Sequence, residues 1–348
     1  MAISTQEKMF FAEHLSLMLK GGISLADSLD TLKREVKSKK FKKALNDIFK
    51  RVLEGESLAR GMSFHSDVFD NFFRGIVSVG EESGSLEENL KYLALDLGKE
   101  NELKKKIKGA FIYPMIVVLL AVVIALITTF FVLPKVINLL SMLRVELPLA
   151  TKILINSTKF VQSNYLFIFL GIILFFVALK ILVRFKKVKF YIDKISLSLP
   201  FLGKIFKSSS LARFSQIFYT LLKSGIPVLE AMEISSRTLP NAVFKKDIIA
   251  IRLRVERGEK ISLGLKEASK NFPLIFCQMV SVGEKSGSLE ESFLYLSNFY
   301  EKEVDSFVKD FSVVLEPILL ILVGVFVAFV ALAIITPIFR FTQSLRFR

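Results

Sequence analysis

Few side chains in this sequence are of the types that carry out chemistry. The chain of 348 residues has one cysteine and two histidines, and neither His14 nor His65 has cysteine or carboxylate neighbours at metal-ligand spacing. Cys277 alone cannot form an intramolecular disulfide or a thiolate cluster. No nucleophile, base and orienting group are grouped, and no loop of the form Gly-x-x-x-x-Gly-Lys-Ser/Thr occurs. We therefore predict that the protein is not an enzyme and has no cofactor or metal, so ATP-driven work belongs to another chain.

The most specific pattern is an acidic, glycine-containing motif that occurs twice. Residues 77–88 read VSVGEESGSLEE, and residues 280–291 read VSVGEKSGSLEE. One interpretation is functional: two exposed acids on a glycine turn are gripped by a cytoplasmic partner. The candidate partner-binding residues are Glu81, Gly84, Glu284 and Gly287.

The alternative interpretation of the motif is structural. Gly80 or Gly283 would end a helix, and the following glycine would turn the chain. A capping box would then start the next helix, with the serine accepting from an amide while the glutamate reaches back. The predicted boxes pair Ser85 with Glu88 and Ser288 with Glu291. The two interpretations are compatible.

The motif belongs to a repeat with a fixed offset of 203 residues, which needs no gap. Leu19–Ile23 returns as Leu222–Ile226, and Pro114 returns as Pro317. The repeated unit is therefore a helical domain together with the membrane helix that follows it. Apolar residues recur at spacings of three and four without a sustained period of two, which predicts about six short helices in each domain.

Three apolar runs predict membrane-spanning helices. The mean hydropathy is +0.50, and Phe111–Val132 and Pro317–Phe339 hold no charge, so each can cross a hydrocarbon core of about 30 Å. The middle run begins at Tyr165 and reaches Val183 if Lys180 snorkels to the interface. The predicted fold class is an all-α membrane protein with two homologous six-helix cytoplasmic bundles and three transmembrane helices.

The distribution of charge predicts the orientation in the membrane. The net charge is +15, and most of the excess lies beside the apolar runs, which favours lipid headgroups and argues against nucleic acid. Twelve Lys and Arg residues flank the spans on the side of the two domains and seven lie on the other side. The positive-inside rule then predicts that the N-terminus and both domains lie in the cytoplasm. The predicted segments are a first cytoplasmic domain at 1–110, transmembrane helix 1 at 111–134, an outside loop at 135–164, transmembrane helix 2 at 165–183, a second cytoplasmic domain at 184–313, transmembrane helix 3 at 314–339 and an outside tail at 340–348.

Three residues at the membrane boundary are candidates for coupling the domains to the membrane helices. Glu316 is an ionisable group beside a membrane span, which is a functional candidate by default, although its counterpart in the first copy is Tyr113. Pro114 and Pro317 either start the membrane helices or kink them so that movement of a domain reaches the membrane. The candidate coupling residues are Pro114, Glu316 and Pro317.

With these motifs the sequence resembles the general secretion pathway F and type IV pilus assembly platform family. Besides the two acidic motifs, the resemblance rests on Leu147–Thr151, Leu221–Pro227 and Glu316–Pro317, and it covers essentially the whole chain. It implies the homo-oligomeric inner-membrane platform of a type II secretion or type IV pilus system. The implied partners are a cytoplasmic hexameric assembly ATPase, pilins or pseudopilins, and other inner-membrane assembly proteins. The alternative is a membrane transporter subunit, which would be expected to line its spans with more polar groups than these runs contain.

Overall fold

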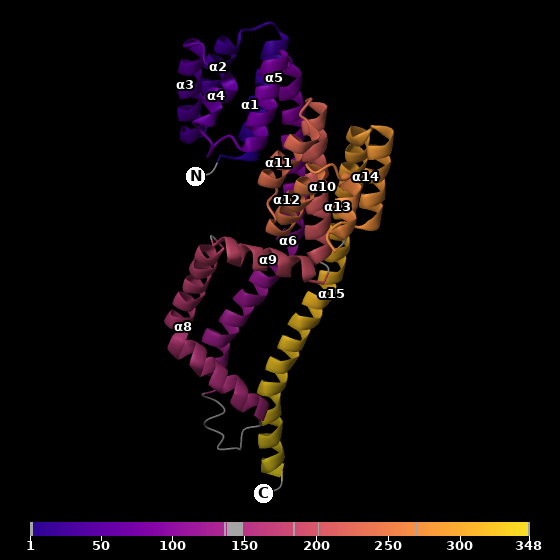
Figure 1. Cartoon of the computed structure of the whole chain (residues 1–348). Helices are drawn as coiled ribbons and strands as arrows, with labels where there is room; N and C mark the ends of the chain where they lie inside the picture. The colour runs from indigo at the N-terminus through magenta and orange to yellow at the C-terminus, as the bar shows by residue number, and fades with distance from the viewer. Residues whose placement is uncertain are drawn as a thin grey trace. The chain divides into compact units, whose positions relative to one another are not determined.

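The computed structural model in Figure 1 describes residues 3–135, 137, 149–183, 185–200, 202–268 and 270–346. These residues form helices joined by short turns, and no strand occurs among them. The chain divides into two compact units. The first holds the residues up to Ile107 together with Phe190–Phe307, and the second holds Lys108–Lys189 together with the residues from Val308 onward. Most of the predicted loop before Leu149 lies outside the described residues.

The first unit contains both copies of the repeat, and each is built from six helices. The first repeat comprises α1 (Thr5–Lys20), α2 (Leu25–Glu35), α3 (Lys39–Leu53), α4 (Leu58–Ser63), α5 (Asn71–Ser83) and the beginning of α6 (Leu86–Ile127). The second comprises α10 (Leu202–Lys223), α11 (Val228–Thr238), α12 (Ala242–Val255), α13 (Ile261–Glu267), α14 (Leu274–Ser286) and the beginning of α15 (Leu289–Arg346). The offset read from the sequence is kept in space, since α2 and α11, and likewise α5 and α14, start and end at corresponding residues. The predicted fold class is confirmed.

A cluster of phenylalanines forms the centre of each bundle. In the first repeat the rings of Phe11, Phe41, Phe69 and Phe73 lie with their centroids 4.9 to 6.3 Å apart. The corresponding residues of the second repeat, Phe214, Phe244, Phe272 and Phe276, form a similar cluster. All eight side chains are buried. Edge and tilted ring contacts at these distances stabilise the core beyond the area that they bury, so repetition of the phenylalanines explains why both copies adopt one fold.

The second unit contains three helical segments that are long and apolar enough to cross a membrane. Two of them are the later parts of α6 and α15, and the third lies in α8 (Leu149–Leu182). Helix α8 is kinked at Asn164, which has φ −118° and ψ 15°, next to the residue where the sequence predicts the middle span to begin. Beyond α8, α9 (Lys186–Ser198) leads back to the second repeat.

A π-helical turn, η1 (Thr128–Val132), follows α6. Wide turns of this kind leave carbonyl groups without a regular partner in the helix. Gln162 of α8 donates a hydrogen bond from Nε2 to the carbonyl oxygen of Thr129 at 2.7 Å. Thr151 Oγ1 likewise donates to the carbonyl of Ala333 at 2.7 Å. These two polar contacts connect α8 to the helices on either side of it.

Candidate functional site

The acid of the first motif caps a short helix in its own repeat. The backbone N–H groups of Leu58 and Ala59 donate to Glu81 Oε1 at 2.5 Å and to Oε2 at 2.8 Å. The first amides of a helix have no partner inside the helix, and a carboxylate there is also favoured by the helix dipole. Ser57 Oγ accepts a further amide, that of Arg60, at 3.2 Å. The N-terminus of α4 is therefore capped by two side chains, Ser57 next to it in sequence and Glu81 from α5.

The acid of the second motif does the same for α13. The backbone N–H groups of Ile261 and Ser262 donate to Glu284 Oε1 at 2.5 Å and to Oε2 at 3.0 Å. Lys260 occupies the N-cap position and contributes no side-chain hydrogen bond. Glu284 is thus the side chain that caps α13. The structure gives both motif acids a partner within their own repeat and leaves them part-buried.

The glycines of the motif have two distinct tasks. Gly84 and Gly287 have φ of 71° and 73° and end α5 and α14 in the left-handed conformation, which favours glycine. The prediction that Gly80 or Gly283 ends a helix is wrong, because both lie inside their helices. A Cβ on Gly80 would come within 2.9 Å of Leu86 Cα. These residues are glycine because the next helix passes too close for a side chain.

The predicted capping boxes also take another form among the described residues. Ser85 Oγ lies 2.6 Å from Ser83 Oγ, and Ser288 Oγ lies 2.6 Å from Ser286 Oγ. Ser83 and Ser286 in turn donate to carbonyls of the preceding helix turn. The serines therefore join the end of one helix to the start of the next. In both repeats Gly84 and Gly287 remain exposed at the tip of this turn.

The candidate coupling residues lie in the second unit, where α6 and α15 are side by side. Tyr113 OH donates to Glu316 Oε1 at 3.5 Å, and these residues are counterparts at the offset of 203. The rings of Phe111 and Phe311 lie 5.4 Å apart. The equivalent residues Tyr113 and Glu316 therefore meet each other near the start of the apolar segments, on two helices that run in the same direction.

The two prolines do not start the membrane helices. Helix α6 begins at Leu86 and continues through Pro114, and α15 begins at Leu289 and continues through Pro317. A proline inside a helix has no N–H to donate and displaces the carbonyl four residues earlier. Each helix therefore carries a weakened point a few residues before its most apolar part, and Glu316 adjoins one of them.

An ion-pair cluster that sequence reasoning missed joins the two repeats in the first unit. Arg213 of α10 donates to Asp96 Oδ2 at 2.8 Å and reaches Glu100 Oε2 at 2.7 Å, both on α6. Burial raises the pKa of Asp96 against the attraction of Arg213. Burial opposes ionisation of Glu100 as well, but the charges of Arg213 and Lys104 outweigh it and lower the pKa of that carboxyl.

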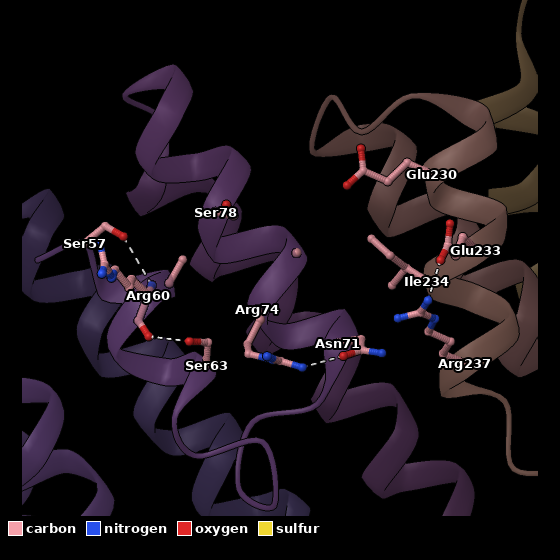
Figure 2. Close-up of a pocket in the computed structure, with 12 residues that line it drawn as sticks. Ser57, Arg60, Ser63, Asn71, Arg74, Ser78, Glu230, Glu233, Ile234 and Arg237 are labelled. Carbon is pink, nitrogen blue, oxygen red and sulfur yellow. Dashed lines mark hydrogen bonds and ion pairs between the residues drawn. The ribbon is translucent and has the colours of Figure 1, made fainter.

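A cleft of about 650 Å³ also lies between the repeats (Figure 2). Arg60 and Arg74 line it from α4 and α5, and Glu233 and Arg237 line it from α11. Arg237 pairs with Glu233 at 2.6 Å, whereas Arg74 donates from Nη2 to Asn71 and has a buried Nε without a partner. Charged side chains line the cleft from both repeats, so we interpret it as a solvent-filled gap where the two repeats are incompletely packed.

A departure from the repeat is the signal that could have revealed this contact. The counterpart of Arg213 is Phe10, and the counterpart of Asp96 is Phe299. A position that is charged in one copy and aromatic in the other indicates that the two copies contact different partners at that position. Among the described residues, no group of three His, Cys, Asp or Glu side chains could hold a metal ion.

Comparison with known proteins places the repeat in a family. The model of the family described as "Type II secretion system (T2SS), protein F" matches residues 11–134 and again residues 214–337. The two matched segments are displaced by the same offset as the helices, and together they cover more than half of the chain.

Curated relatives match over nearly the full length. The type IV pilus assembly protein PilC of Thermus thermophilus is 31% identical over 96% of this chain and 82% of the relative. The PilC of Pseudomonas aeruginosa is 30% identical over 95% of this chain and 88% of the relative. The type II secretion system protein F of Vibrio cholerae is 26% identical over 97% and 82%. Relatives from pilus and secretion systems are thus both represented.

Proposed function

Because the chain belongs to the type II secretion system protein F family, we propose that it is the inner-membrane platform of a type II secretion or type IV pilus machine. In this role it couples a cytoplasmic assembly ATPase to the assembly of pilins or pseudopilins into a fibre. The observation that carries the proposal is the continuity of α6 and α15. Each is one helix that begins at the motif turn of its repeat and ends in an apolar segment. A helix that is continuous from the motif turn to the apolar segment can carry a push or rotation along its length, and the proline inside it is the point where it would bend.

The proposed orientation has both repeats and the N-terminus in the cytoplasm. It is supported by the excess of Lys and Arg beside the spans on the side of the repeats. The middle span fits the same orientation, because two copies of one unit face the same side only if an even number of crossings separates them.

Labelling of single cysteines tests this orientation. In a Cys277→Ala background, Lys152→Cys is expected to react with a membrane-impermeant maleimide added to intact spheroplasts. Lys105→Cys is expected to react only after the membrane is permeabilised. The reverse pattern would contradict the orientation.

The ATPase-binding surface is proposed at the two motif turns. Gly84 and Gly287 are exposed at the tips of these turns, while Glu81 and Glu284 fix the adjoining helices by capping them. A partner that contacts both tips would load α6 and α15 together, since each helix starts directly after its tip.

Copurification with the assembly ATPase tests this surface with a matched control. Asparagine tolerates the left-handed conformation, so Gly84→Asn with Gly287→Asn adds side chains to both tips without breaking the turns. Gly55→Asn makes the same change at another turn of positive φ, where a Cβ also meets nothing within 4 Å. We expect the double variant to lose the ATPase and Gly55→Asn to retain it. Equal binding by both would remove the motif turns from the proposed surface.

The coupling step is proposed at Pro114, Glu316 and Pro317. Here α6 and α15 meet through Tyr113 and Glu316, so relative movement of the two helices must change this contact. Tyr113→Phe and Glu316→Gln weaken the same contact from opposite sides. Both are expected to reduce fibre assembly or secretion while the ATPase still copurifies. Normal assembly in both variants would show that the contact has no part in coupling.

The competing function is a membrane transporter subunit, which a flux measurement can distinguish from a platform. A transporter moves a solute without pilin, pseudopilin or ATPase. Purified protein in liposomes is expected to give no solute flux, and cells lacking it are expected to lose secretion or pili. Reconstituted flux would contradict the platform.

A further inference from the structure

The two repeats of the first unit contact each other through unlike faces. The first repeat uses α5 and α6, here named the α5–α6 face. The second uses α10 and α11 with the adjoining turn of α15, here named the α10–α11 face. Lys99 of α6 donates to Gln216 at 3.0 Å and to Asn298 at 3.1 Å. A Cβ on Gly75 of α5 would lie 2.9 Å from Ile234 Cδ1 of α11. A contact between unlike faces of equivalent units is heterologous.

A heterologous contact uses only one of the two faces on each unit. The second repeat also has the equivalent of the α5–α6 face, on α14 and α15, and the first repeat has the equivalent of the α10–α11 face, on α1 and α2. Within the described residues neither of these, named the α14–α15 face and the α1–α2 face, takes part in the contact between the repeats. The chain therefore presents one unused member of each complementary pair.

Both unused faces expose apolar side chains whose counterparts are covered. Ile275 of α14 is 40% exposed and its neighbour Leu274 is 67% exposed. The counterpart of Ile275 in the first repeat is Phe72, which is 1% exposed. On the α1–α2 face Ile23 is 44% exposed, while its counterpart Ile226 is 2% exposed. Apolar surface at these positions is buried wherever the chain itself supplies the complementary face.

The α1–α2 face also carries an open groove of about 610 Å³ between α1 and α6. Its walls include Glu13, Leu17, Leu95 and Gly98. The residues of the second repeat that correspond to Glu13, Leu95 and Gly98 are Gln216, Asn298 and Glu301, and Lys99 contacts all three. The groove of the first repeat is thus the place where a lysine from a complementary face would lie.

The charges that would meet in a second such contact are complementary. The counterparts of Lys99 and Gln216 are Lys302 and Glu13, so a neutral acceptor is replaced by a carboxylate. The counterparts of Lys106 and Asp305, which pair at 2.8 Å, are Lys309 and Glu102. All four of these counterparts are exposed. The buried Arg213 and Asp96 are replaced by Phe10 and Phe299, which are an apolar pair.

From these observations we propose that a second copy of this chain places its α1–α2 face on the α14–α15 face of the first. Lys302 of one copy then pairs with Glu13 of the other, in the way that Lys99 meets Gln216 within one chain. All copies enter the membrane in the same direction, so a second copy presents its first repeat in the same sense as the chain's own. Repetition of this heterologous contact gives a row of alternating first and second repeats, which forms a ring where the rotation between copies closes. The proposal concerns copies of this chain and stands independently of the ATPase and pilin partners.

Crosslinking between two differently tagged copies tests the pairing. Both copies carry Cys277→Ala; one also carries Lys302→Cys and the other Glu13→Cys, and membranes are treated with a short bismaleimide. We expect a product that carries both tags. A single chain with Lys99→Cys and Gln216→Cys is the positive control and crosslinks within itself. Lys43→Cys replaces Glu13→Cys as the negative control, because Lys43 is exposed and lies on α3, which belongs to neither face.

Two results of the crosslinking would overturn the proposal. One is a yield for Lys302→Cys with Glu13→Cys no higher than with Lys43→Cys. The other is efficient crosslinking of Lys302→Cys to itself in two copies, which would show that like faces meet.

Charge reversal provides a second readout that does not depend on added cysteines. Lys302→Glu and Glu13→Lys each place like charges opposite one another, and we expect each to raise the dissociation constant of the copies in nanodiscs at least about tenfold. The two reversals combined in one chain restore opposite charges and are expected to recover association. Both positions are exposed, so monomer folding is unaffected, which a thermal melt checks. Unchanged association in the single variants, or no recovery in the double variant, would overturn the proposal.

Discussion

Removal of the capping acid is expected to be more costly in the second repeat than in the first. Glu81 and Glu284 each accept two backbone amides at the start of a short helix. The two sites differ in the N-cap residue: Ser57 accepts an amide of α4, whereas Lys260 accepts none of α13. The perturbations are Glu81→Ala and Glu284→Ala, each made alone in the full chain.

The magnitude follows from the hydrogen bonds. A hydrogen bond to a charged group contributes about 1.5 to 3 kcal/mol, and the lower value applies where water can replace it. Loss of both bonds then costs about 3 kcal/mol at α13. At α4 the hydroxyl oxygen of Ser57, which already accepts the amide of Arg60, can also accept the freed amide of Ala59, and an N-cap hydrogen bond of this kind contributes about 1 kcal/mol. The expected loss at α4 is therefore about 2 kcal/mol.

Hydrogen exchange of the protein in nanodiscs measures these losses locally. Because 1.4 kcal/mol is about a factor of ten, amides of α13 are expected to exchange about 100-fold faster in Glu284→Ala. Amides of α4 are expected to exchange about 30-fold faster in Glu81→Ala. Amides of α2 serve as the internal reference. Lys260→Ser added to Glu284→Ala should recover about fivefold in α13.

Two results would refute this reasoning. Equal acceleration in both repeats would show that the serine does not compensate for the missing acid. Unchanged exchange in α13 would show that Glu284 does not stabilise the helix at all, and would return the motif acids to the proposed partner surface.

Three further outcomes are expected. Gly283→Ala should lower the thermal midpoint, with a cost of about 2 kcal/mol, because a Cβ there would lie 2.5 Å from Ser292 Oγ. Arg213→Met should cost about 3 to 5 kcal/mol in denaturation, because it leaves the buried charge of Asp96 unpaired, and Arg213→Met combined with Asp96→Leu should recover most of it. The pKa of Glu100 is lowered in the folded state, so its ionised carboxylate stabilises the fold at pH values above the ordinary glutamate pKa of about 4.3. This stabilisation is lost as the pH falls through the lowered pKa of Glu100. The difference in thermal midpoint between wild type and Glu100→Gln should therefore be present at pH 7 and vanish in acid.

Most of the fold could be predicted because the sequence that forms it occurs twice in the chain. The offset fixes the helix boundaries, and the recurring phenylalanines of the core, such as Phe11 and Phe214, show which positions are buried. The duplicated motif was found for the same reason. Its chemistry was not, because the partners of Glu81 are the amides of Leu58 and Ala59, and backbone amides leave no trace in the residue types.

The contact between the repeats could not be predicted from the repeat itself. A pattern that is common to both copies reports what each does alone, whereas Arg213, Asp96 and Lys99 act between them. Likewise the close approach at Gly80 depends on the path of α6, which a glycine in a run of small residues does not reveal. The helix end at Gly84 follows the ordinary rule for a left-handed cap, and the glycine four residues earlier obscured it.

The buried cluster of Arg213, Asp96 and Glu100 determines which repeat can pack against the α5–α6 face. If the first repeat of another chain displaced the second repeat, Phe10 would stand opposite Asp96 and leave a buried carboxylate without a cation. Such a mismatch costs several kcal/mol. The cluster therefore discriminates between a chain's own second repeat and the first repeat of a neighbour. The α5–α6 face therefore accepts a second repeat and rejects a first repeat, so the contact within a chain and the proposed contact between chains stay distinct during assembly.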